Sequence, residues 1–171
     1  NTFKNRKEKI FNNWHFSLNH GNRKELFDKI NKEDNYFLNN KLNRLLNWKH
    51  QSEYKYTFCP SGKGIDDPRI YESIILGNIP IRLEEKISKF HKDMPIIYID
   101  KIKDLNLDFI NSKFQNFQNQ KFNFDKLFLD YWKNKINIDK KHDLSSFQNI
   151  SLEDFRFKLT DYYLKHFKDY E

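Results

Sequence analysis

The sequence predicts an α/β domain with a mainly parallel sheet, and three stretches of the chain carry this prediction. Residues 54–83 read as strand, glycine turn, helix and strand, which is the order of a βαβ crossover. Residues 94–100 (MPIIYID) are an apolar run of strand length, as expected for a parallel strand that is buried on both faces. Residues 9–31 repeat the order of strand, turn and helix.

The N-terminal part of the chain is expected to supply the first strand and two helices. Residues 9–18 are predicted to form that strand with its approach, residues 17–22 the turn after it, and residues 23–31 a helix. A second helix is predicted over residues 36–48, because apolar residues recur there at helical spacing, and these residues are therefore expected in the core. They are Phe37, Leu38, Leu42, Leu45, Leu46 and Trp48.

The central unit has local signals for each of its boundaries. Residues 54–59 are aromatic and β-prone, and residues 60–64 (PSGKG) break regular structure. Asp66 or Asp67 is expected to cap the following helix. Gly77 is expected to end that helix, because glycine takes positive φ without strain. A short buried strand over residues 79–81 follows.

The remaining elements define the predicted domain organisation. We expect a short helix over residues 84–92, helices over 104–120 and 124–136, a polar linker over 139–149 and an amphipathic helix over 152–170. Residues 1–138 would then form one domain, and residues 139–171 a linker and a helix that packs on it. The alternative is that this last helix packs on another domain.

Composition restricts the partners. The 171 residues carry 31 Lys and Arg against 24 Asp and Glu, a net charge of +7, which favours anionic ligands. The basic residues are interspersed with acidic ones and form no stripe, so nucleic acid is not favoured. The single cysteine, Cys59, excludes an internal disulfide and favours a reducing, cytoplasmic compartment, with Cys59 as a small buried hydrophobe. No apolar run approaches the roughly 18 residues of a membrane span, and no signal peptide is visible.

The glycine turn and the helix after it predict an anion site. Gly62 and Gly64 allow a ligand to approach the backbone, and the helix directs its N–H groups and positive dipole end at the same place. Lys63 and Arg69 add positive charge, so phosphate or diphosphate is the expected ligand. Glu72, one helical turn beyond Arg69, is suited to accept bonds from sugar hydroxyls. The alternative is an ordinary surface ion pair between Arg69 and Glu72.

The glycine turn is part of a longer sequence motif that extends over residues 60–81. This stretch resembles the signature of exostosin-like glycosyltransferases, Pro-Arg-Gly-x-Gly-x-Asp-x-x-Arg-x-x-Glu followed by a helix that ends Leu-Gly-x-Ile-Pro-Ile. The matching residues are Pro60, Gly62, Gly64, Ile65, Asp66, Arg69, Glu72, Leu76, Gly77, Ile79, Pro80 and Ile81. Ser61 stands where the family has Arg, and Pro68 where His is common. The resemblance extends over about residues 9–136.

The resemblance implies a Rossmann-like three-layer domain, the C-terminal, donor-binding half of a two-domain GT-B glycosyltransferase. It implies that Glu72 holds the ribose of a UDP- or GDP-linked sugar and that the diphosphate is held by a set of turn and helix residues. That set is Ser61, Gly62, Lys63, Gly64, Asp66 and Arg69, with Arg23 facing the donor. Arg23 is alternatively a solvated residue of the first turn of its helix. The acceptor-binding N-terminal half would be a separate part of a longer protein, as the start at Asn1 also suggests.

The same reasoning defines the expected chemistry. The sequence has no Asp-x-Asp, so we expect a metal-independent site in which cationic side chains neutralise the leaving diphosphate. Asp66 is the one carboxylate close to the turn, and helix capping is favoured for it over a role as general base. The alternatives to a glycosyltransferase are a non-catalytic nucleotide-sugar-binding module and a basic nucleic-acid-binding domain.

Richness in Asn, Lys and Ile is typical of AT-rich genomes, as in giant viruses and some protists.

Overall fold

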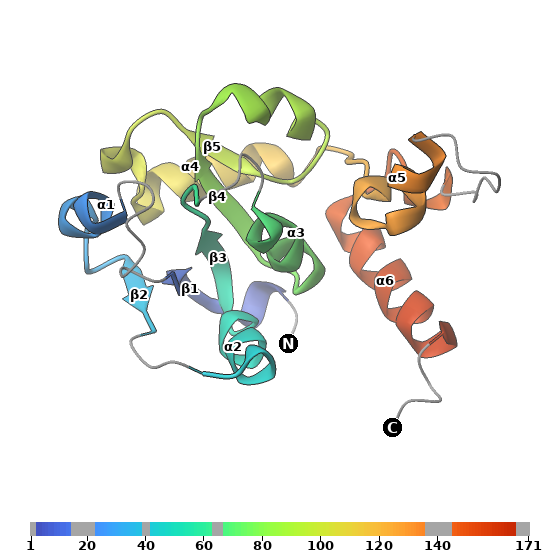
Figure 1. Ribbon diagram of the computed structural model, residues 1–171, viewed down its shortest axis with the longest axis horizontal. Helices are drawn as coiled ribbons and strands as arrows, with labels where there is room; N and C mark the ends of the chain where they lie inside the picture. Colours follow the sequence, from blue (N-terminus) through green and yellow to red (C-terminus); the bar gives the residue numbers. More distant parts are fainter. Residues whose placement is uncertain (1–2, 15–22, 39–41, 63–66, 136–144, 167–171) are drawn as a thin grey trace. The chain divides into compact units, whose positions relative to one another are not determined.

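The computed structural model describes residues 3–14, 23–38, 42–62, 67–135 and 145–166, except for the side chains of residues 146 and 160–166 (Figure 1). The chain divides into two compact units. The first unit consists of Asn1–Lys92 and Ile96–Gln115, and the second of Asp93–Pro95 and Asn116–Glu171. The predicted domain boundary at residue 138 lies outside the described residues and stays a prediction.

The first unit contains a five-stranded sheet in the order β2-β1-β3-β4-β5, and every neighbouring pair of strands is parallel. The strands are β1 (Lys7–Asn12), β2 (Asn35–Phe37), β3 (Tyr54–Phe58), β4 (Ile79–Leu83) and β5 (Ile97–Ile99). The predicted α/β class with a parallel sheet is therefore confirmed. Buried isoleucines of β1, β4 and β5 form much of the core, as expected for a sheet that is covered on both faces.

Helices flank the sheet on both faces and make three layers, as Figure 1 shows. They are α1 (Arg23–Lys29), α2 (Arg44–Gln51), α3 (Pro68–Ile75) and α4 (Leu107–Phe117). The Tyr56 hydroxyl donates to Asn111 of α4 over 2.5 Å, whereas the Cys59 sulfur lies 3.7 Å from the Ser73 hydroxyl of α3. Side chains three apart on an extended chain point to opposite faces, so α3 and α4 cover opposite sides of the sheet. Gln51 of α2 bonds to Ser73 over 3.0 Å and places α2 beside α3.

The predicted central βαβ unit is confirmed from β3 to β4. The Asp67 side chain caps α3 by accepting from the Arg69 backbone N–H over 3.0 Å. Pro68 occupies the first helical position, where its missing N–H costs no hydrogen bond. Gly77 ends the helix with a φ of 79°, a conformation that favours glycine.

The predicted helix over residues 36–48 is wrong in its first part. Asn35–Phe37 is strand β2, in which Tyr36 pairs with Phe11 of β1 and stacks on the Tyr54 ring with centroids 5.0 Å apart. These aromatic contacts with distant strands outweigh the local helical spacing. The helix begins only at Arg44, after Asn43 caps it with an extended backbone.

This late start also exposes residues that were expected in the core. Leu45 is 73 % exposed and Leu46 is also exposed, whereas Gln51 at the end of α2 is buried. The burial of α2 therefore depends on its C-terminal turn, where Gln51 bonds to Ser73.

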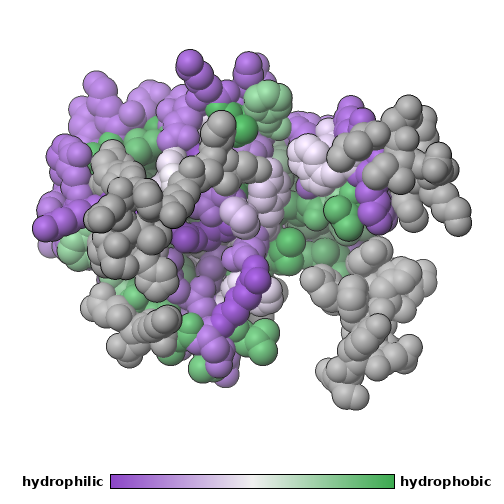
Figure 2. Space-filling view, viewed as in Figure 1, coloured by the Kyte–Doolittle hydropathy of each residue, from purple (hydrophilic) through white to green (hydrophobic). Residues whose placement is uncertain are grey.

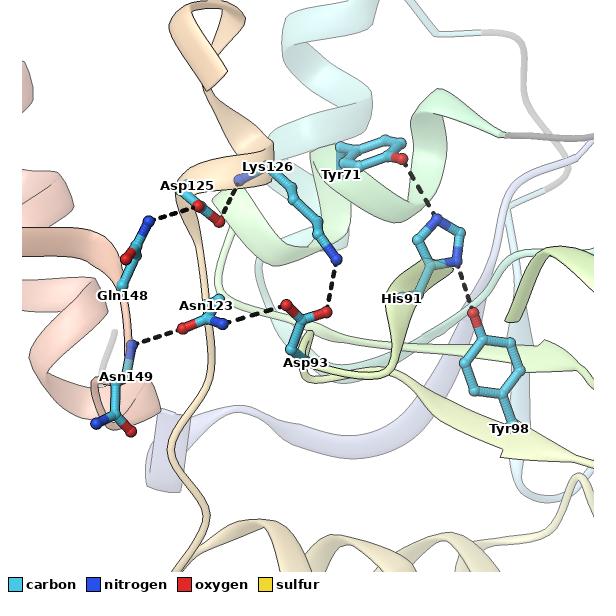
Figure 3. A network of polar contacts seen from close by, with 9 residues as sticks. All are labelled: Tyr71, His91, Asp93, Tyr98, Asn123, Asp125, Lys126, Gln148 and Asn149. Atoms are coloured by element: carbon cyan, nitrogen blue, oxygen red, sulfur yellow. Dashed lines mark hydrogen bonds and ion pairs between the residues drawn. The ribbon is translucent and has the colours of Figure 1, made fainter. Parts of the chain in front are cut away.

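The predicted helix over residues 84–92 is a 3-10 helix, Lys86–His91. A 3-10 helix has three residues per turn, so Ser88 and His91 share the buried face, and Phe90 is exposed. Buried His91 is held between two phenols: its Nδ1 lies 2.7 Å from the Tyr98 hydroxyl and its Nε2 3.3 Å from that of Tyr71 (Figure 3).

The second unit contains α5 (Leu129–Lys135), α6 (Leu152–His166) and the 3-10 helices Asp125–Leu127 and Ser145–Phe147. Its core is aromatic: the Phe124 and Phe155 rings stack in parallel with centroids 3.8 Å apart, and Phe147 is buried beside Phe155. Residues 145–149 therefore belong to this unit and not to a linker, whereas residues 139–144 lie outside the described residues. Phe124 to Ile136 was expected to be one helix, but a 3-10 turn and an extended Phe128 precede α5.

A polar network ties the segments of the second unit together (Figure 3). Lys126 forms an ion pair with Asp93 at 2.6 Å, and the Asn123 amide donates to Asp93 over 3.2 Å. The backbone N–H of Asn149 in turn donates to the Asn123 side chain over 2.7 Å. These bonds join segments of the second unit that lie far apart in the sequence.

Candidate functional site

The candidate site lies where β1 and β3 end side by side. The connection after β1 runs through α1 to β2 on one side, and the connection after β3 runs through α3 to β4 on the other. This divergence of the two connections is the topological switch point of an open parallel sheet. Ligands of such sheets bind in the crevice outside the carboxyl ends of the strands at this point.

Arg23 is the residue that α1 contributes to this point. Its side chain is only 5 % exposed, and its Nε donates to the backbone oxygen of Ser61 over 3.3 Å. Burial lowers the pKa of Arg23, the nearby positive charge of Arg69 lowers it further, and Asp67 opposes both effects. The alternative of a solvated first-turn residue is therefore excluded for Arg23, whose guanidinium lies against the glycine turn.

Gly62 is needed because the Arg23 guanidinium lies so close to it. A Cβ on Gly62 would stand 2.9 Å from Arg23 Nη2, closer than real Cβ contacts. The backbone of Gly62 does not have positive φ, so an alanine there meets, among the described residues, only the Arg23 guanidinium. The glycine thus keeps space for the guanidinium at the turn.

Substitution of Gly62 by Ala is therefore expected to move the guanidinium without disturbing the fold. The atom that must shift is the end of a flexible side chain, so the free energy of unfolding should change by less than about 0.5 kcal/mol. If the turn holds a diphosphate, as the sequence predicts, the dissociation constant for pyrophosphate should rise about 3- to 10-fold, because an arginine contact is displaced. Calorimetric titration of Gly62→Ala, Arg23→Ala and the double variant checks this. Additive effects of the two substitutions would contradict it, because both should act through the same guanidinium.

Arg69 approaches the turn from α3. Its Nη1 is buried and has no hydrogen-bond partner among the described residues. A buried donor without a partner costs about 1–3 kcal/mol, and more when it is charged, so a ligand oxygen at this atom would recover that energy. An anion beside Arg69 would also relieve its repulsion with Arg23.

Glu72 is held by α2 and not by Arg69. Arg44 forms an ion pair with one carboxylate oxygen, and the Trp48 indole donates to the other over 3.3 Å. The Arg44 guanidinium lies over the Trp48 ring at 4.8 Å. The alternative of an Arg69–Glu72 pair is thus replaced, within the described residues, by a contact between α2 and α3. Arg44 and Trp48 were not predicted, because no local pattern pairs them with Glu72.

Ser61 connects the turn to β4. Its hydroxyl donates to Glu85 and accepts from Arg82 Nη2 over 3.3 Å, and Arg82 also pairs with Glu85 at 2.9 Å. Arg82 is fully buried, and its role was not predicted from the sequence. The one available signal was a charged residue inside the otherwise apolar strand segment IPIRL. Lys63, Gly64 and Asp66 lie outside the described residues.

Cys59, at the end of β3, is a buried thiol rather than a reactive one. Burial raises its pKa to about 12; the positive charge of Arg69 opposes this shift more weakly, and the carboxylate of Asp67 adds to it. Because the folded state holds this proton more tightly than the unfolded state, its contribution to stability is present below about pH 9 and is lost as the pH rises toward 12.

We therefore expect the free energy of unfolding to fall by up to about 1.4 kcal/mol per pH unit above pH 9 because of Cys59 alone. Urea denaturation at several pH values, compared between the wild type and Cys59→Ala, isolates this contribution from that of the tyrosines. Parallel pH profiles of the two proteins would contradict it.

Within the described ranges, no three His, Cys, Asp or Glu side chains gather as metal ligands would. The surface in Figure 2 is largely hydrophilic, and in the described part of the chain no helix has the length and apolar character to cross a membrane. Comparison with known protein families gave no match, and neither did comparison with curated proteins.

Proposed function

We propose that this chain is the donor-binding domain of a glycosyltransferase and binds a UDP- or GDP-linked sugar through its diphosphate. The observation that carries the proposal is the pair of guanidiniums, Arg23 and Arg69, at the β1/β3 switch point. Arg69 Nη1 is buried there without a partner among the described residues. The signature around Gly62 supports a nucleotide sugar over other anions.

A diphosphate suits this arrangement better than a single phosphate. Each charge-assisted hydrogen bond to a phosphate oxygen contributes about 1.5–3 kcal/mol, and two separate guanidiniums favour two phosphates. The N-terminus of α3 adds backbone donors and a positive dipole end at the same place. In the proposed reaction these groups, with Lys63, stabilise the charge of the leaving nucleoside diphosphate without a metal.

Glu72 is the proposed ribose ligand. Each carboxylate oxygen has two lone pairs, so Glu72 can accept bonds from two sugar hydroxyls while it stays bonded to Arg44 and Trp48. These two residues hold the carboxylate in place, which lowers the entropy cost of binding.

The general base for the acceptor hydroxyl would come from the N-terminal half of the enzyme, so the chain alone is expected to bind the donor without completing transfer. One observation favours a second candidate, a non-catalytic nucleotide-sugar-binding module. Ser61 stands where the resembling family has Arg, and here its hydroxyl is bonded to Glu85. Turnover by a protein that contains both halves would exclude this second candidate.

The test is a calorimetric titration of the chain with UDP, GDP, their sugars, UMP, GMP and pyrophosphate. We expect saturable binding of one nucleoside diphosphate, with about 10-fold or more weaker binding of the matching monophosphate. Absence of binding by every diphosphate would contradict the proposal.

A further inference from the structure

We propose that Arg82 and Ser61 form an anion subsite that the Glu85 carboxylate fills in the unliganded protein. The inference rests on the proposed function, and it adds regulation of the same site by an internal competitor. In this arrangement the Glu85 oxygens stand in for the oxygens of a phosphate. A phosphate bound at the turn displaces Glu85 from both partners.

The first argument is the burial of Arg82. Its side chain is completely buried at the carboxyl end of β4, although a guanidinium strongly prefers water. Its Nη2 contacts Glu85 at 2.9 Å and the Ser61 hydroxyl at 3.3 Å. The cost of burying a charge of this kind is met only by an anion at close range.

The second argument is the exposure of Glu85, the anion that pairs with the buried Arg82. The Glu85 side chain is 36 % exposed, whereas that of Arg82 has no exposed surface. Glu85 is therefore the removable member of the pair, and its departure uncovers the guanidinium and the Ser61 hydroxyl together. The surrounding bonds lower the pKa of Glu85 against the effect of its partial burial, so the competitor is an anion at neutral pH.

The third argument is the position of the cluster relative to the other cations. Ser61 contacts Arg23 through its backbone oxygen and Arg82 through its hydroxyl. The guanidiniums of Arg23 and Arg82 thus contact the same residue, Ser61, at different atoms. Because both guanidiniums contact Ser61, one diphosphate is a better candidate for a common ligand than two independent ions. Pyrophosphate is therefore the simplest probe of the subsite.

The test compares pyrophosphate binding to the wild type, Glu85→Gln and Glu84→Gln in calorimetric titrations of the 171-residue chain. Glutamine keeps the size and a carbonyl oxygen of Glu85 but removes the competing charge. Glu84→Gln is the matched control, since it removes the same charge from an exposed neighbour. We expect Glu85→Gln to bind pyrophosphate about 3- to 10-fold more tightly than the wild type, with less than a 2-fold change for Glu84→Gln.

The outcomes separate this inference from the proposed function. Equal or weaker binding by Glu85→Gln, in a protein whose binding of diphosphates depends on Arg69, would overturn the inference alone. No binding of pyrophosphate, UDP or GDP to either the wild type or Glu85→Gln would overturn both.

Folding of each variant is checked by circular dichroism. Glu85 precedes the 3-10 helix Lys86–His91 as its N-terminal cap, where serine is a preferred residue. Glu85→Ser is therefore a second variant with the same expected gain in affinity. Absence of this gain in Glu85→Ser would overturn the inference in the same way as its absence in Glu85→Gln.

Discussion

Replacing Arg69 by alanine is expected to weaken the binding of UDP or GDP by about 10- to 100-fold, the largest effect on binding of any single substitution in the site. Arg69 Nη1 is buried and without a partner among the described residues, so the bond that a phosphate makes to it replaces no existing protein bond. The backbone N–H of residue 69 still donates to Asp67 in the variant, and the cap of α3 is kept. Calorimetric titration of the wild type and the variant gives the ratio of dissociation constants.

Two companion variants make this result specific. Lys24→Ala removes one positive charge from an exposed position beside Arg23 and should change the dissociation constant by less than about 2-fold. Glu72→Gln should weaken the binding of UDP but not of pyrophosphate, which has no ribose. An Arg69→Ala protein that binds UDP as tightly as the wild type would show that the diphosphate lies elsewhere.

The part of the fold that the sequence predicted best is the central βαβ unit, because each of its boundaries is set by a single local residue. Asp67 caps α3, Pro68 begins it and Gly77 ends it with positive φ, and none of these roles depends on a distant contact. Prediction failed in the first part of residues 36–48, where long-range pairing of Asn35–Phe37 with β1 decides the structure. A helical spacing of apolar residues occurs there, but the strand β2 buries Asn35 beside Asn12 instead.

In the candidate site, too, the residues that lie close together in the sequence were predicted, and the long-range contacts were not. Gly62 and Arg69 were predicted because they belong to one short turn and the helix after it. The partners Arg44 and Arg82 were not, because they reach Glu72 and Ser61 across 28 and 21 residues of sequence. Contacts between elements at this separation depend on the order of strands in the sheet, which local spacing does not reveal. The signal that would have marked Arg82 as a site residue is its charge within a strand that is otherwise apolar and buried.

The second unit is the part whose stability should depend most on one aromatic contact. Substitution of Phe155 by Ala is expected to destabilise this unit by about 3–5 kcal/mol, the range for removing a buried phenylalanine ring. Phe155 is fully buried and stacks on Phe124 at 3.8 Å with the rings 6° from parallel, so its removal leaves a cavity beside Phe147 as well. Hydrogen exchange measured by mass spectrometry should show lost protection in peptides from residues 116–159.

Phe157→Ala is the matched control, because Phe157 lies on the same helix and is 78 % exposed. Its effect on stability should stay within about 0.5 kcal/mol. Every described residue of the candidate site belongs to the first unit, so Phe155→Ala should leave the dissociation constant for UDP unchanged. Loss of protection throughout both units, together with loss of UDP binding, would mean instead that the two units fold as one cooperative structure, in which a cavity in the second removes the switch point of the first.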